Sequence, residues 1–82
     1  MKKYTMKVFS QPTCGPCNEF KKDLNDKNIT FTDKDVTSDP EAGEEFISKG
    51  FQFTPTSIIE VDGKTHTIVG GNLSRIEELL GL

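Results

Sequence analysis

The chain has 82 residues, 33% of them hydrophobic and 28% charged, with a formal net charge of −3. A chain of this size builds one thin hydrophobic core, which excludes a second domain and predicts a single domain over residues 1–82. Its basic residues are scattered and no apolar run approaches the ~18 residues of a membrane span, so we expect neither nucleic acid nor a membrane as partner. Residues 1–11 lack the apolar segment of a secretory signal, and for a complete chain we expect a cytoplasmic protein.

The first half of the chain predicts a strand, a helix and a second strand. The mainly apolar segment 6–9 predicts a buried strand that stops at the turn 11–13. Gly15 and Pro16 then open a helix from Gly15 to Lys27, because proline suits a first turn where its missing N–H is not needed. Residues 29–36 alternate apolar and polar side chains, which predicts a half-exposed strand near a sheet edge. In the helix 15–27, apolar residues recur at intervals of three and four, so we expect Cys17, Phe20 and Leu24 to form its buried face. Lys21 and Lys22 are expected to lie in solvent.

A second helix follows, over residues 38–49. Ser38 or Asp39 can serve as its N-cap, and acidic side chains near its start suit the positive end of the helix dipole. Phe46 and Ile47 are expected to face the core, and Gly50 ends the helix.

The last third predicts a hairpin and a final helix. Residues 57–61 form a strand, Asp62-Gly63 is a strong hairpin signal, and residues 65–69 return as the partner strand. Gly70 and Gly71 break this strand, Asn72 can cap the next helix, and the apolar face of that helix consists of Leu73, Ile76, Leu79 and Leu80. The order βαβαββα predicts an α/β protein with a four-stranded mixed sheet and three helices.

The cysteine pair stands where the first strand meets the first helix. In Cys14-Gly15-Pro16-Cys17, a thiolate at Cys14 would face the free N–H groups of the helix N-terminus, which favour an anion. Thiols in such sites have pKa values of roughly 3.5–7.5, against about 8.5 for a free thiol. We therefore expect Cys14 to be the nucleophile and Cys17, one turn inside, to be the resolving thiol, rather than two inert buried cysteines.

Two further segments are candidates for the substrate site. A cis Pro55 would leave the backbone of Thr54 free to pair with an extended peptide or glutathione, although local sequence alone favours an ordinary trans proline that limits the next strand. Gly70-Gly71-Asn72 is either a plain strand-to-helix turn or a place where helix N–H groups hold a carboxylate of glutathione.

Together these segments resemble a glutaredoxin-like redoxin, and the closest subgroup is the NrdH redoxins, electron donors to ribonucleotide reductase. The resemblance rests on residues 9–17, the Asp-Pro-Glu-Ala run at 39–42, Thr54-Pro55 and Gly70-Gly71, in the same order along nearly the whole chain. It implies a thioredoxin-like fold and a cis Pro55. It also implies a substrate groove beside Cys14, flanked by Thr13, Thr54 and Pro55 and by Gly70, Gly71 and Asn72.

The chain also departs from the families that it resembles. Gly15-Pro16 is the dipeptide of thioredoxins, yet Thr13 stands where thioredoxins carry Trp, and Val8 stands where they bury a carboxylate. Gln11 replaces a lysine common in small redoxins, and the C-terminal signature of NrdH redoxins is absent.

We therefore expect a monomeric, cytoplasmic dithiol–disulfide oxidoreductase that reduces protein disulfides, with ribonucleotide reductase as the substrate that the resemblance suggests. The chemistry needs no bound metal or organic cofactor, and electrons arrive from NADPH through thioredoxin reductase or from glutathione. The alternatives are a carrier of Cu or Zn, since two thiolates suit soft metals, and an iron–sulfur-binding relative of glutaredoxins. Small metallochaperones, however, have the element order βαββαβ, which differs from the order predicted for this chain. Pro16 within the cysteine motif disfavours binding of an iron–sulfur cluster.

Overall fold

Four strands and three helices make up residues 2–82, the part of the chain that the computed structural model describes. In chain order they are β1 (Tyr4–Ser10), α1 (Gly15–Asp26), β2 (Thr32–Asp35), α2 (Pro40–Ser48), β3 (Thr56–Val61), β4 (Lys64–Val69) and α3 (Leu73–Leu80). The predicted order is confirmed. β2 starts later than predicted, because the Ile29 N–H donates to the Leu24 carbonyl, at 2.9 Å, in the turn that follows α1.

The four strands form one mixed sheet in the order β2-β1-β3-β4. β1 runs parallel to β2, whereas the β1–β3 and β3–β4 pairs are antiparallel. In this register Phe9, near the end of β1, lies opposite Thr56 at the start of β3. The segment that follows β1 and the segment that precedes β3 therefore meet at the same end of the sheet.

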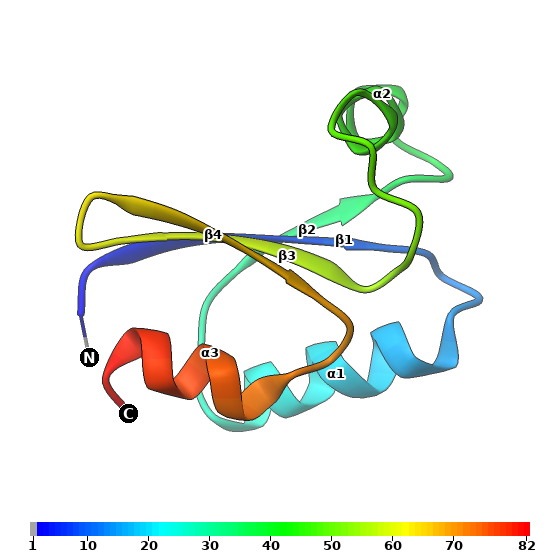
Figure 1. Ribbon diagram of the computed structural model, residues 1–82. Coiled ribbons are helices and arrows are strands. Elements are labelled where there is room, and N and C mark those ends of the chain that lie inside the picture. Colours follow the sequence, from blue (N-terminus) through cyan, green and yellow to red (C-terminus); the bar gives the residue numbers. More distant parts are fainter. Residues whose placement is uncertain (1) are drawn as a thin grey trace.

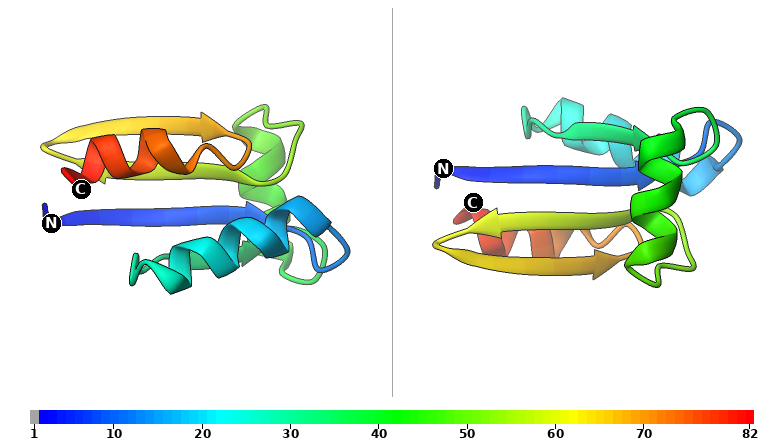
Figure 2. Two further views of the ribbon diagram at one scale, coloured as in Figure 1. Left: turned by 90° about the horizontal axis from the view of Figure 1, so that it is seen from below. Right: turned by 90° about the horizontal axis from the view of Figure 1, so that it is seen from above.

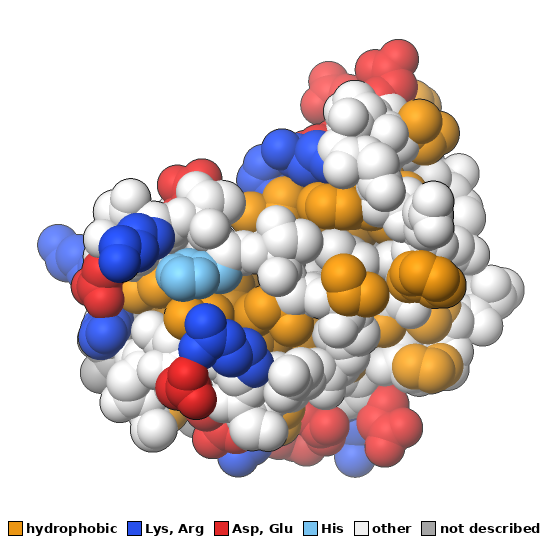
Figure 3. Space-filling model, viewed as in Figure 1, with side chains coloured by type: hydrophobic (Ala, Val, Ile, Leu, Met, Phe, Trp, Pro, Cys, Tyr) orange, Lys and Arg blue, Asp and Glu red, His pale blue; other side chains and the backbone are white. Residues whose placement is uncertain are grey.

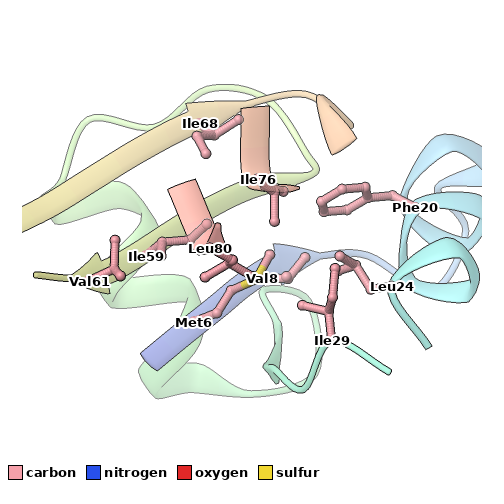
Figure 4. Close-up of a cluster of buried hydrophobic side chains, with 10 residues drawn as sticks. All are labelled: Met6, Val8, Phe20, Leu24, Ile29, Ile59, Val61, Ile68, Ile76 and Leu80. Atoms are coloured by element: carbon pink, nitrogen blue, oxygen red, sulfur yellow. The ribbon is translucent and has the colours of Figure 1, made fainter. Parts of the chain in front are cut away.

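The helices cover the two faces of the sheet unequally. α1 and α3 lie on one face, and α2 crosses the other face near the end of β1 (Figures 1 and 2). The main core lies under α1 and α3 (Figure 4) and consists of Met6, Val8, Phe20, Leu24, Ile29, Ile59, Val61, Ile68, Ile76 and Leu80.

A second apolar cluster holds α2 against the sheet. The ring of Phe9, fully buried, lies 5.9 Å from the ring of Phe46 and 5.7 Å from that of Phe51, measured between centroids. Ala42 is also buried, and it precedes Phe46 by one helical turn. The expectation that Ile47 faces the core is wrong, since 77% of its surface is exposed. Only one face of the helix can pack against the sheet, and Ala42 and Phe46 lie on that face.

The caps agree with the amino-acid sequence. Asp39, rather than Ser38, is the N-cap of α2 and accepts a hydrogen bond from the Glu41 N–H. Asn72 is the N-cap of α3. The helices have 12, 9 and 8 residues, and within residues 2–82 none combines the length and apolar character needed to cross a bilayer.

Candidate active site

Cys14 and Cys17 form a disulfide at the N-terminus of α1, with their Cα atoms 5.2 Å apart. Cys14 is the N-cap of the helix, and its Sγ accepts a hydrogen bond from the Cys17 N–H at 3.1 Å. The sulfur that we expect to be the nucleophile thus occupies the position of a capping oxygen, where a helix N–H favours negative charge. Cys14 is half-buried and Cys17 fully buried, so external groups reach Cys14 first.

The turn that carries Cys14 is held by its own hydrogen bonds. The Cys14 N–H donates to the Gln11 carbonyl at 3.1 Å, and the Asn18 side-chain amide donates to the Pro12 carbonyl at 3.0 Å. Thr13 lies exposed on this turn, and Gly15 and Pro16 are exposed in the first turn of α1. The segment therefore presents Cys14 on a fixed turn with one side open to solvent.

The Thr54-Pro55 loop lies against this sulfur, forty residues away in the chain. The Thr54 hydroxyl lies 3.7 Å from the Cys14 Sγ, and the Thr54 carbonyl oxygen lies 3.8 Å from it. The Thr54-Pro55 peptide bond is cis, as the resemblance implied and against the local preference for trans. Pro55 itself is buried, whereas Phe53, two residues earlier, is 65% exposed.

The glycine pair borders the same loop. The Gly70 N–H donates to the Pro55 carbonyl at 2.8 Å, and a Cβ at Gly71 would lie 3.4 Å from the Phe20 ring of α1. The side-chain oxygen of Asn72 accepts a hydrogen bond from the Arg75 N–H at 3.2 Å. Asn72 therefore acts as a helix cap, and the turn is joined to Pro55 by a hydrogen bond and to α1 through the Phe20 ring.

One polar cluster near the cysteines was not predicted from the sequence. The buried Ser10 hydroxyl donates to the Asp33 carboxylate at 2.6 Å, and the Lys21 ammonium lies 3.0 Å from the same carboxylate. The expectation that Lys21 lies in solvent is wrong, because its side chain is only 20% exposed. The available signal was its position four residues after Cys17, which places both side chains on one side of α1.

Charge is unevenly distributed around the disulfide. Three segments surround it, residues 8–20, 50–56 and 68–74, and none of them contains a Lys or Arg. Glu19 is their only charged residue. Among residues 2–82, no group of three or more His, Cys, Asp and Glu side chains is placed to share a metal ion.

The fold and the cysteine pair define a class of protein. The structure superposes on a point variant of the thioredoxin-like protein BC3987 with a TM-score of 0.76 and 27% identity, covering 94% of this chain and 95% of that one. It superposes on Fasciola hepatica thioredoxin with a TM-score of 0.74 and 21% identity, covering 98% and 80%. The chain therefore has a thioredoxin-like fold.

Sequence comparison identifies the family. The glutaredoxin family model matches residues 4–64. An uncharacterized glutaredoxin-like 8.6 kDa protein in the rubredoxin operon of Clostridium pasteurianum is 37% identical over 75 residues, which are 92% of this chain and 96% of that protein. The chain belongs to the glutaredoxin family, and it is a glutaredoxin-like redoxin with a CxxC pair.

Proposed function

We propose that this chain is a dithiol–disulfide oxidoreductase that reduces disulfides in other proteins. The observation that supports it best is the asymmetry of the cysteine pair. Cys14 is accessible, with its sulfur at the end of a helix, and Cys17 is buried one turn inside. A nucleophilic thiol needs access and stabilisation of its thiolate, whereas a resolving thiol needs only to reach the first sulfur.

The reaction proceeds by two exchanges. The Cys14 thiolate attacks one sulfur of the target disulfide, and the displaced target thiolate takes up a proton. The Cys17 thiol then gives up its proton and attacks the Cys14 sulfur of the mixed disulfide, which releases the second target thiol. Two electrons have passed to the target, and the Cys14–Cys17 disulfide remains.

The oxidised chain then needs an external reductant. The proposed sources are NADPH through thioredoxin reductase, or glutathione. Ribonucleotide reductase is the protein substrate to test first, because the chain resembles the redoxins that serve it. Thr13, Thr54, Pro55 and the Gly70-Gly71-Asn72 turn are the proposed substrate contacts.

Trapping tests this assignment of the two thiols. With Cys17→Ser, the mixed disulfide must wait for an external thiol at about 1 mM, whereas well-oriented intramolecular attack reaches effective molarities of about 10⁵ M. We expect this variant to accumulate a mixed disulfide with an oxidised protein substrate, visible as a shifted band on a non-reducing gel. Cys14→Ser should form none, and equal trapping by both variants would contradict the mechanism.

Regeneration distinguishes the two reductants. Oxidised protein is offered NADPH with thioredoxin reductase, or glutathione with glutathione reductase and NADPH, with Cys14→Ser as the control. NADPH consumption in the first system alone assigns a thioredoxin-like supply of electrons, and consumption in the second assigns a glutathione-linked one. Consumption in neither would contradict the proposed function.

A further inference from the structure

A groove lies between the N-terminal half of α1 and the Gly-Gly turn. It has a volume of about 240 Å³ and is lined by Pro16, Glu19, Phe20, Asp23 and Gly71. We call it the α1 groove. Phe20 is almost completely buried, and the close approach of Gly71 to its ring joins the two walls. Pro16 belongs to the cysteine motif itself, so one end of the groove lies at the first turn of α1, two residues after Cys14 in the sequence.

The α1 groove combines apolar walls with two carboxylates. Among the described residues, neither Glu19 nor Asp23 forms an ion pair with a Lys or Arg of this chain. The segments around the disulfide supply no cation either. In the space-filling view, acidic side chains lie along the lower edge with basic side chains beside them, and hydrophobic groups lie towards the end of the molecule where α1 begins (Figure 3). A ligand in this groove therefore meets two carboxylates that are not engaged in an ion pair with Lys or Arg among residues 2–82.

We propose that the α1 groove selects protein substrates with a Lys or Arg close to the target cysteine. This inference rests on the proposed function and names its class of substrate. The aliphatic stem of such a side chain packs against Pro16 and Phe20, while its cationic end meets Glu19 and Asp23. Lys and Arg are the residues that combine a long apolar stem with a permanent positive charge.

Helix geometry sets the position of the basic residue. At a rise of 1.5 Å per residue, Glu19 lies roughly 7–8 Å and Asp23 roughly 13–14 Å along α1 from Cys14. An extended peptide advances about 3.3–3.6 Å per residue. A basic side chain two to four residues from the target cysteine therefore reaches one carboxylate or the other.

The same charges disfavour glutathione as a substrate. Glutathione carries two carboxylates and one ammonium group, so it is anionic near neutral pH. With Glu19 and Asp23 along α1 and no Lys or Arg in the three surrounding segments, the α1 groove offers the carboxylates of glutathione repulsion, and those segments offer them no ion pair. The carboxylates that repel glutathione attract a basic polypeptide segment, so they favour its binding.

The experiment compares matched peptides. Each peptide contains one disulfide and a single variable residue, Lys, Gln or Glu, placed one to six positions from the attacked cysteine. We expect kcat/KM for Lys to exceed that for Gln by roughly two- to fivefold at the second to fourth positions, and Glu to be disfavoured by a similar factor. The preference should shrink as added salt shortens the Debye length from about 8 Å towards 3 Å.

Variants assign the effect to the groove. The double variant Glu19→Gln/Asp23→Asn should abolish the Lys preference, and Glu19→Lys/Asp23→Lys should reverse it in favour of Glu peptides. Glu60→Gln is the matched control, because Glu60 is an exposed carboxylate on β3 at the opposite end of the sheet. It should leave the preference unchanged.

The possible failures are distinguishable. Equal kcat/KM for Lys, Gln and Glu peptides would overturn the inference while leaving the proposed function intact. A glutathione mixed disulfide reduced with higher kcat/KM than every Lys peptide would also overturn it. Failure of the wild-type protein to reduce any peptide would overturn the proposed function, and the inference with it.

Discussion

Two neighbouring residues of α2, Phe46 and Ile47, provide a sharp test of how this helix is held to the sheet. The ring of Phe46 lies 5.9 Å from that of Phe9 and 5.8 Å from that of Phe51. Ile47, the next residue, is 77% exposed. Alanine at each position removes a large apolar side chain from the same turn, so the two variants differ mainly in the contacts that are lost.

The contacts determine the expected size of each effect. Each aromatic pair contributes about 0.5–1.5 kcal/mol beyond area burial, so loss of both Phe46 pairs costs about 1–3 kcal/mol. Lost burial adds to this, and because Phe46 is only partly buried we expect Phe46→Ala to cost about 3 kcal/mol, the low end of the usual range for Phe→Ala. Ile47→Ala should change the free energy of unfolding by less than about 0.5 kcal/mol, since alanine also favours the helix.

Urea unfolding of the oxidised proteins, followed by far-UV circular dichroism, measures both values. In thermal unfolding, 1 kcal/mol corresponds to a shift in Tm of about 4–8 °C in a domain of this size, so Phe46→Ala should lose about 12–24 °C. The Tm of Phe46→Leu, which keeps most of the apolar volume, should lie between those of Phe46→Ala and the wild type. A cost for Ile47→Ala equal to that for Phe46→Ala would refute the assignment of the buried face.

Three further predictions concern the cysteines, a cap and a carboxylate. In the reduced protein, iodoacetamide should label Cys14 before Cys17, because only Cys14 is accessible, and faster labelling of Cys17 by mass spectrometry would mean that the roles are reversed. Asn72→Ala removes the acceptor of the Arg75 N–H and should lower the free energy of unfolding by about 1 kcal/mol, whereas Asn72→Ser should restore most of it. Hydroxyl groups of Ser38 and Thr37 donate to the Asp35 carboxylate and hold its pKa well below its usual range. The stability that the ionised Asp35 contributes is complete above the unfolded-chain pKa of about 3.9, and it is lost as the pH falls towards the lower pKa of the folded protein. Asp35→Asn should therefore reduce the loss of Tm between about pH 5 and about pH 2. An unchanged dependence of Tm on pH in this range would count against the prediction.

Local signals in the sequence were sufficient where one residue determines the conformation. Asp62 and Gly63 both have positive φ, 55° and 72°, which is the backbone requirement that makes this dipeptide a hairpin signal. Pro16 in the first turn of α1 and Asn72 before α3 likewise serve the positions that their chemistry favours. These short-range signals, together with the alternation of strands and helices, predict the order of the whole fold.

Contacts between distant segments could not be predicted in the same way. Phe51 lies in the loop between α2 and β3, yet its ring completes the cluster of Phe9 and Phe46. Adjacent residues of a helix point about 100° apart, so Phe46 and Ile47 could not both face the sheet. Lys21 reaches the Asp33 carboxylate only because β2 runs beside β1 under α1. In each case the missing information was which face meets which neighbour, and hydrophobicity alone does not give it.

Gly43, in the middle of α2, is a case where local propensity and tertiary packing predict opposite results. Replacing glycine by alanine inside a helix normally gains about 1 kcal/mol. Here a Cβ at Gly43 would lie 3.0 Å from the Val36 carbonyl oxygen. That carbonyl cannot yield freely, because the Val36 N–H donates to the Ser10 carbonyl at the end of β1, at 3.0 Å.

Overpacking of this kind costs about 1–3 kcal/mol, so we expect Gly43→Ala to lower the free energy of unfolding by up to about 2 kcal/mol instead of raising it. Gly15→Ala is the matched control. A Cβ at Gly15 meets nothing within 4 Å, and this variant should gain about 0.4–1 kcal/mol through the unfolded chain. Equal gains for both variants in urea unfolding would mean that α2 can move away from Val36.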